Sequence, residues 1–126
     1  MTDFISSERL LTSVLQSSPY GIMTFESVRN QSNEIVDFKW QLVNEAAEKI
    51  VGKDKVKLVG RNLLDVLPGN RKSGLFDTYK RVVETGTAAQ FEQFYEADGL
   101  SFWFDISAVK IADGFTVTFQ DITALK

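Results

Sequence analysis

The feature that most constrains this fold is where apolar and polar residues alternate along the chain. Alternation at every second residue places one set of side chains on one face of a β-strand. It occurs in two separate stretches, residues 20–42 and residues 91–119, and the sequence between them has mostly helical spacing. Two strands and three strands joined by a helical segment can complete one antiparallel sheet of five strands. The helical segment must then cover the apolar face of that sheet.

The first stretch predicts a β-hairpin. An extended run begins at Tyr20 and places Ile22, Thr24 and Glu26 on one side, and the polar residues 30–33 predict a turn. The second run predicts a half-buried strand, because polar residues separate four apolar ones: Val36, Phe38, Trp40 and Leu42.

The second stretch predicts three strands joined by tight turns. Asp98-Gly99 and Asp113-Gly114 are strong signals for such turns. The residues expected on the same face of each strand are Phe91, Gln93 and Tyr95 in the first, Phe102, Phe104, Ile106 and Ala108 in the second, and Phe115, Val117 and Phe119 in the third.

Helices are predicted at the start and in the middle of the chain. The first would be capped by Ser6 or Ser7 and stopped by Pro19, and a second would begin after Asn44 and end at Gly52. A short apolar turn, residues 63–67, is expected to end at Pro68-Gly69. The clearest amphipathic helix ends at Gly86 and has its apolar residues at Leu75, Phe76, Tyr79, Val82 and Val83.

The composition excludes several chemistries. The chain has no cysteine and no histidine, so it lacks the usual thiolate nucleophile, metal ligands and axial haem ligand. A net charge of −3 argues against a nucleic-acid partner, because phosphate binding needs a clustered basic surface. There is no apolar run near the roughly 20 residues that span a bilayer, and no signal peptide. We expect a cytoplasmic segment without membrane contact.

Motifs spread over nearly the whole chain resemble the PAS domain family. The matching pieces are residues 18–22, 43–48, 58–64, 67–68, 79–86, 103–106 and 119–123. The resemblance implies an α+β fold with an antiparallel sheet in strand order 2-1-5-4-3 and helices on one face. It also implies a sensor or protein-contact module fused to an output domain such as a histidine kinase or a cyclase. We expect an N-terminal helix at 1–17, the domain at 18–123, and the start of a linker to an output domain at 124–126.

The triplet Gly60-Arg61-Asn62 resembles the opening of the motif that light-sensing relatives use to bind flavin. Those relatives place a cysteine next, and this chain has Leu63 there. A flavin–cysteine adduct is therefore excluded, and the lack of histidine excludes a His-ligated haem. The cofactor is otherwise unknown. The simpler interpretation of the triplet is a glycine-opened turn into a short helix.

Three candidate sites follow. The first is a ligand pocket between the sheet and the helices, for a small apolar or aromatic molecule. The alternative is that its aromatic side chains simply fill the core. Strand phase does not say which face points inward, and we favour Trp40, Phe104 and Phe119 as inward. The candidate lining residues are Trp40, Leu64, Leu67, Tyr79, Phe91, Phe104 and Phe119.

The second candidate site is the end of the last strand. In PAS sensors the triplet that corresponds to Asp121, Ile122 and Thr123 joins the sheet to the outgoing helix. Asp121 or Thr123 can accept hydrogen bonds from the free N–H groups of that helix, and Asp121 is expected to pair with a basic group on the sheet, such as Lys110. The third candidate is a homodimer contact on the N-terminal helix, formed by Phe4, Leu11, Val14 and Leu15. The alternative is that this helix packs on its own sheet.

Other functions are less well supported by the residues. Glu45 with Glu48 and Glu92 with Glu96 are the only paired carboxylates of interest, and no nucleophile neighbours either pair. We therefore expect no catalytic activity in this segment, although the parent protein can be an enzyme. The alternatives left open are a ligand-free dimerisation module, a small enzyme or lipid carrier of similar outline, and a flavin or haem sensor without the usual ligands.

Overall fold

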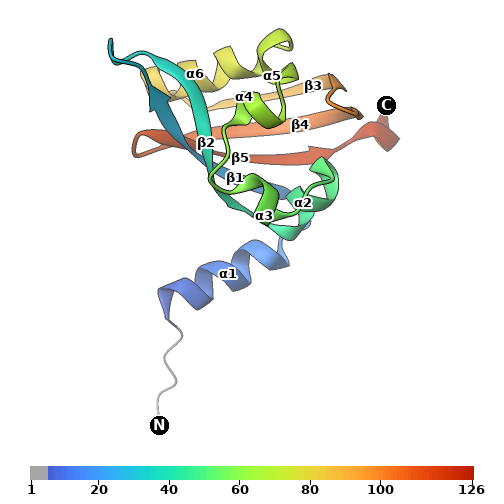
Figure 1. The fold of residues 1–126 in the computed structure, drawn as a ribbon. Coiled ribbons are helices and arrows are strands. Elements are labelled where there is room, and N and C mark those ends of the chain that lie inside the picture. Colours follow the sequence, from blue (N-terminus) through green and yellow to red (C-terminus); the bar gives the residue numbers. More distant parts are fainter. Residues whose placement is uncertain (1–5) are drawn as a thin grey trace.

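The computed structural model describes residues 6–126 of the chain, and Figure 1 shows their arrangement. Its elements in chain order are α1 (Ser7–Ser17), β1 (Gly21–Arg29), β2 (Ile35–Val43), α2 (Glu45–Val51), α3 (Lys55–Leu58), α4 (Leu63–Val66), α5 (Gly69–Lys72), α6 (Leu75–Thr85), β3 (Ala89–Ala97), β4 (Leu100–Ile111), β5 (Gly114–Asp121) and a final 3₁₀ turn, η1 (Thr123–Leu125).

The five strands form one antiparallel sheet in the order β2-β1-β5-β4-β3. The N-terminal hairpin and the three C-terminal strands meet where β1 pairs with β5, from Gly21 opposite Phe119 to Glu26 opposite Gly114. Helix α6 contacts β4 and β5, while α4 contacts β2 and α2 contacts β1. Figure 1 shows α4, α5 and α6 over the sheet. The α+β class and the strand order expected from the sequence are confirmed.

The alternation in the C-terminal strands is confirmed. Phe104, Ile106 and Ala108 of β4 are buried, as are Phe115, Val117 and Phe119 of β5. On β1, Ile22, Thr24 and Glu26 do share a face, but it is the outer one, and Met23, Phe25 and Ser27 point inward instead.

Strand β2 departs from simple alternation. Phe38 and Trp40 are fully buried as expected, but Val36 is 40% exposed and Leu42 is only half-buried. The register with β1 skips Val36 and Gln41, which are the extra residues of two irregularities in the pairing. Each extra residue reverses the alternation beyond it, so the strand ends bury Ile35 and Val43.

The predicted helix boundaries largely hold. Ser6 accepts a hydrogen bond from the N–H of Arg9 and caps α1. Gly52 and Gly86 end α2 and α6 in the left-handed conformation, with φ of 79° and 74°. Two one-turn helices, α3 and α5, were not predicted. Helix α5 begins where the sequence suggested only a stop, because Pro68 is tolerated at a helix start.

The turn between β4 and β5 lies one residue earlier than the Asp-Gly signal suggests. Ala112 and Asp113 form the two-residue loop, and Ala112 takes a positive φ of 48°. Gly114 is already in β5, where an added Cβ would collide with the carbonyl oxygen of Phe25. The glycine is therefore required by the close approach of two strands and not by the turn.

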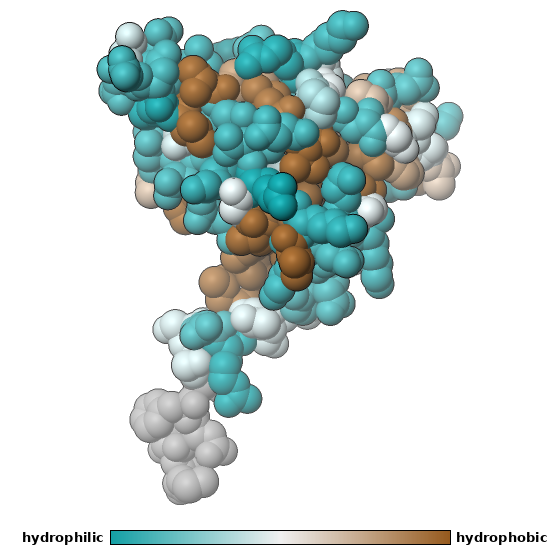
Figure 2. All heavy atoms as spheres, in the orientation of Figure 1, coloured by the Kyte–Doolittle hydropathy of each residue, from teal (hydrophilic) through white to brown (hydrophobic). Residues whose placement is uncertain are grey.

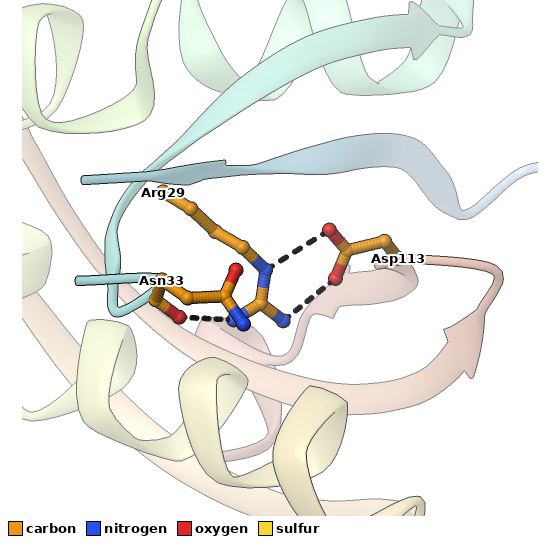
Figure 3. A network of polar contacts seen from close by, with 3 residues as sticks. All are labelled: Arg29, Asn33 and Asp113. Carbon is orange, nitrogen blue, oxygen red and sulfur yellow. Dashed lines mark hydrogen bonds and ion pairs between the residues drawn. The ribbon is translucent and has the colours of Figure 1, made fainter. Parts of the chain in front are cut away.

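A polar clamp joins this turn to the β1–β2 turn, as Figure 3 shows. Arg29 donates two hydrogen bonds to the Asp113 carboxylate, at 3.1 and 2.9 Å, and one to the carbonyl of Asn33 at 2.7 Å. The guanidinium lowers the pKa of Asp113, and the carboxylate raises the pKa of Arg29. Two-point pairing fixes the geometry of both turns.

Next to this clamp the core is built from aromatic rings. The ring of Phe115 lies 4.4 Å from Tyr79, 4.8 Å from Phe38 and 5.0 Å from Phe25. Phe25 also contacts Trp40, and Phe38 contacts Phe76. These six residues are called the aromatic cluster below, and they fill the middle of the core.

Candidate functional site

A small cavity lies between the sheet and the helices, beyond the aromatic cluster and toward the C-terminal end of β5. Its volume is about 50 Å³. The wall is almost wholly apolar, and its residues are Met23, Phe25, Ile50, Val51, Leu63, Leu67, Asn70, Leu75, Tyr79, Tyr95, Leu100, Phe104, Ile106 and Phe119.

The structure places four of the seven candidate pocket residues in this wall: Leu67, Tyr79, Phe104 and Phe119. The other three lie outside it. Trp40 is sealed in the core, where its indole N–H lies 3.3 Å from the sulfur of Met23. Leu64 and Phe91 pack against the edge of the core. Whether the cavity holds a ligand stays a prediction.

A network of polar side chains closes one side of the cavity. Asn70, which is 4% exposed, donates through its amide nitrogen to the carbonyl of Leu67 at 3.2 Å and to the hydroxyl of Tyr95 at 3.3 Å. The Tyr95 hydroxyl donates in turn to Asp98, in the two-residue β3–β4 turn. Asp98 also accepts from the N–H of Gly69. This network fastens the β3–β4 turn to α5.

Tyr79 and Tyr95 both remain protonated near neutral pH. Burial raises the pKa of Tyr79 well above its ordinary value. Burial, followed by the hydrogen bond to Asp98, raises the pKa of Tyr95 as well. Both hydroxyls are therefore hydrogen-bond donors, and neither serves as a base.

The cavity is small for a cofactor. At about 50 Å³ it lies well below the 300 Å³ or so at which pockets for drug-sized ligands begin. The Gly60-Arg61-Asn62 triplet forms the expected turn: Gly60 and Arg61 exchange backbone hydrogen bonds with Trp40, and Leu63 then enters the cavity wall. The residues present do not fit a flavin ring in this arrangement.

The end of β5 is held to β4 through a threonine. The N–H and the hydroxyl of Thr123 both donate to Asp121, and the Thr123 hydroxyl accepts from the N–H of Trp103 at 3.0 Å. The N–H of Ile122 donates to the carbonyl of Trp103 at 2.8 Å, and the Ile122 side chain is buried. The expected bond from Asp121 to a free N–H of the following turn is therefore present.

The expected pairing of Asp121 with Lys110 is wrong. Asp121 lies opposite Phe104 in the register of β4 and β5, whereas Lys110 lies opposite Phe115 near the other end of the same strands. The cation near the strand end is instead Lys126, which pairs with Glu92 at 2.7 Å and lies 5.0 Å from the centre of the Trp103 ring.

The cavity and the strand end are neighbours. Phe104 forms part of the cavity wall, and the next residue back along β4, Trp103, holds Thr123. Phe119, also in the wall, lies two residues before Asp121. Side chains alternate along a strand, so Phe104 and Phe119 face the cavity while the bond from the Trp103 N–H to Thr123 forms beside them, at the end of the inner strands β4 and β5.

The start of the domain depends on Asn44, which sequence reasoning identified only as a helix cap. Its buried side chain accepts from the N–H groups of Ala47 and Ile22 and donates to the carbonyls of Leu15 and Tyr20. These bonds join α1, β1 and α2. An asparagine after a strand gives no sequence signal beyond capping, because its other partners lie more than twenty residues away.

Helix α1 presents an apolar surface that is exposed among the described residues. Leu10, Leu11 and Val14 are each more than half exposed, while Leu15 is half-buried. The end of α1 borders a groove that also includes Val56 and Val59, and hydrophobic atoms gather on the surface in this region in Figure 2. Phe4, the remaining predicted dimer contact, lies outside the described residues.

Residues 6–126 contain neither a candidate metal site nor a candidate membrane-spanning helix. No group of three or more aspartate or glutamate side chains is placed to hold a metal ion. No helix in that range is long and apolar enough to cross a membrane.

Comparison with known proteins identifies the fold. A family model described as the PAS fold matches residues 36–126. A domain of an HTR-like protein from Haloarcula marismortui is 22% identical with a TM-score of 0.63, over 84% of this chain and 100% of that one. A domain of a sensory box sensor histidine kinase/response regulator from Geobacter sulfurreducens is 15% identical with a TM-score of 0.65, over 90% and 93%.

The PAS domain of nitrogen regulation protein NR(II) from Vibrio parahaemolyticus is 12% identical with a TM-score of 0.65, over 90% of this chain and 98% of that one. At these identities the likeness concerns the fold alone. No curated protein matches the chain in sequence.

Proposed function

Because this chain belongs to the PAS family, we propose that it is the sensory and signal-relay module of a larger signalling protein, with a sensor histidine kinase as the parent we favour. The choice of parent is supported by two of the domains that share its fold, which come from proteins described as sensor histidine kinases. The domain itself has no catalytic role in this proposal, and it works in the cytoplasm.

The input is a small molecule in the cavity, or a change in how two copies pack. Either one acts by favouring one of two sheet geometries, since a ligand shifts an equilibrium only by its difference in affinity for the two states. The wall residues Phe104 and Phe119 are the side chains that a bound molecule would displace. The partly empty space beside them gives the rings room to change position.

The output leaves through Asp121, Ile122 and Thr123. The observation that carries the proposal is the adjacency of Phe104, in the cavity wall, and Trp103, whose N–H is bound by Thr123. A shift of β4 at this point changes the hydrogen bonds that set the direction of the chain after β5. Asn44 gives the incoming helix a comparable attachment to the same end of the sheet.

The relay is tested by replacing Asp121 and Thr123 with alanine in the full-length protein. We expect output that no longer responds to input, with an unfolding midpoint close to that of the unchanged protein because both side chains are exposed. Asp113→Ala is the matched control: it also removes a hydrogen-bonded carboxylate, but at the opposite end of β5, and should leave signalling intact. A normal response in the double variant would exclude the relay through this triplet.

A second candidate, a dimerisation module without a ligand, is favoured by the exposed apolar face of α1. Leu11→Glu together with Val14→Glu should then convert a dimer into a monomer in sedimentation equilibrium. Native mass spectrometry separates the two candidates, since an occupied cavity adds a fixed mass to the protein. A visible absorption spectrum detects a flavin or haem directly.

A further inference from the structure

Two polar groups in the cavity wall make no hydrogen bond with the described part of the chain. The first is the hydroxyl of Tyr79, a residue 5% exposed that stacks on Phe115 through its ring. The second is the carbonyl oxygen of the Asn70 side chain. Buried polar groups are almost always paired, so each of these two requires an explanation.

The orientation of the Asn70 amide follows from its partners. The carbonyl oxygen of Leu67 can only accept, so the group that faces it must be the NH₂ group. The proton of the Tyr95 hydroxyl is used on Asp98, so the same NH₂ group also donates to the Tyr95 oxygen. Both amide protons are therefore used, and the carbonyl oxygen of Asn70 is left as a free acceptor.

Both groups border empty space. Within residues 6–126, Ser27 Oγ is the side-chain polar atom that is both fully enclosed and without a hydrogen-bond partner. The Tyr79 hydroxyl and the Asn70 oxygen also lack a partner, but they are not fully enclosed. Both residues line the cavity. Because burial raises the pKa of Tyr79, its hydroxyl stays protonated and donates. The cavity thus offers one donor and one acceptor within an apolar wall.

The wall carries no charged side chain. None of its residues is Asp, Glu, Lys or Arg, and Asp98, the carboxylate that binds the wall residue Tyr95, also accepts a hydrogen bond from Gly69. A carboxylate or ammonium group inside would lose its hydration without gaining an opposite charge, which is costly. The occupant must therefore be uncharged.

We propose that the cavity binds a small uncharged molecule with an alcohol hydroxyl, which accepts a hydrogen bond from Tyr79 and donates one to Asn70. Its hydrocarbon part contacts Met23, Ile106 and Phe119. This refines the ligand-binding role proposed above and rests on it. The cavity of about 50 Å³ has room for about four water-sized groups, which suits an alcohol of about four non-hydrogen atoms.

The test uses propan-1-ol as the probe and the 126-residue chain as the protein. Propionate and propylammonium are the matched probes, since they have nearly the same size and carry a negative or a positive charge. Methyl NMR spectra are recorded at millimolar probe concentrations. We expect saturable shifts at Met23, Leu67 and Ile106 with propan-1-ol and none with either ion.

Tyr79→Phe provides the matched variant, because it removes the hydroxyl and keeps the ring on Phe115. We expect propan-1-ol to bind it about fivefold more weakly, the effect of losing one neutral hydrogen bond. The unfolding midpoint without probe should stay the same or rise, since an unpaired buried hydroxyl is lost. Equal affinity for both proteins would overturn the assigned role of Tyr79.

The remaining outcomes separate this inference from the proposed function. Binding of propionate or propylammonium as strong as that of propan-1-ol would overturn the ligand class and leave a ligand-binding sensor in place. No shift with any of the three probes would overturn the cavity site for small alcohols. The Asp121 and Thr123 variants test the relay independently in either case.

Discussion

The two ends of the sheet are built differently. At one end, the β1–β2 and β4–β5 turns are joined by the Arg29–Asp113 clamp, and three rings of the aromatic cluster that do not line the cavity, Phe38, Phe76 and Phe115, pack the nearby core. At the other end lie the cavity, the β3–β4 turn, the start of β1 and the end of β5. We call these the clamped end and the cavity end.

The contrast separates stability from adaptability. Close-packed interiors resist small displacements, so the clamped end fixes the register of the strands. The cavity end keeps free volume where the chain both enters and leaves the sheet, at Gly21 and Asp121. A sensor needs a rigid end and an adaptable end, since movement at one end changes the geometry of the outgoing chain only if the rest of the sheet stays fixed.

The largest expected effect compares two phenylalanines on the same face of β5. Phe115→Ala, at the clamped end, should lower the free energy of unfolding by about 5 kcal/mol, because the fully buried ring packs against three others and its removal leaves a large void. Phe119→Ala, beside the cavity, should cost about 3 kcal/mol, since its neighbours have room to relax. Urea denaturation of both variants measures the difference, and equal losses would contradict the division into two ends.

An intermediate effect is expected from Asp98 at the cavity end. Asp98→Ala should cost about 2 kcal/mol, because it leaves the Tyr95 hydroxyl without its acceptor and puts alanine at a positive φ. Asp98→Asn keeps an acceptor and tolerates that φ, so it should cost about 1 kcal/mol. The two are compared by urea denaturation. If Asp98→Asn were the more harmful, the carboxylate charge would matter more than the hydrogen bond.

The smallest effect concerns the clamp, whose partners are exposed. The Arg29 guanidinium lowers the folded-state pKa of Asp113 below its ordinary value of 3.8. The clamp therefore contributes its full stability above pH 3.8 and loses it as pH falls through the lower folded-state pKa. Thermal unfolding of the parent and of Asp113→Asn should differ slightly at pH 6 and converge near pH 2. A difference that persists at pH 2 would show that the ion pair is not its source.

Much of the fold was predictable because its signals are local. Alternation in β4 and β5 follows from the buried and exposed faces of the sheet. Asn44 accepts a hydrogen bond from a free N–H at the start of α2, and the backbone N–H groups of Gly52 and Gly86 donate to carbonyls at the ends of α2 and α6. The irregularities in β2 were not predictable. Val36 and Leu42 are apolar and continue the pattern, so nothing in the sequence marks the places where the register shifts.

The cavity was harder to predict than the strands. Phe91 and Tyr95 share one face of β3, but only Tyr95 lies in the wall. Tyr95 is held there by its contact with Asn70 of α5, 25 residues away in sequence, which alternation does not encode. Asn70 sits among Gly69, Arg71 and Lys72, so its sequence surroundings suggest an exposed turn. Trp40 was expected in the wall as an aromatic residue on the inward face of its strand, but it is fully buried in the core instead.

The Lys126–Trp103 contact gives this molecule an optical readout of its own. The chain contains two tryptophans: Trp40 is fully buried, while Trp103 lies beneath the ammonium group of Lys126 and beside Phe94. Movement of the chain after β5 would alter the surroundings of Trp103 and leave Trp40 unchanged. In the tryptophan fluorescence of the unlabelled protein, Trp40 therefore serves as an internal reference and Trp103 reports movement of the chain after β5.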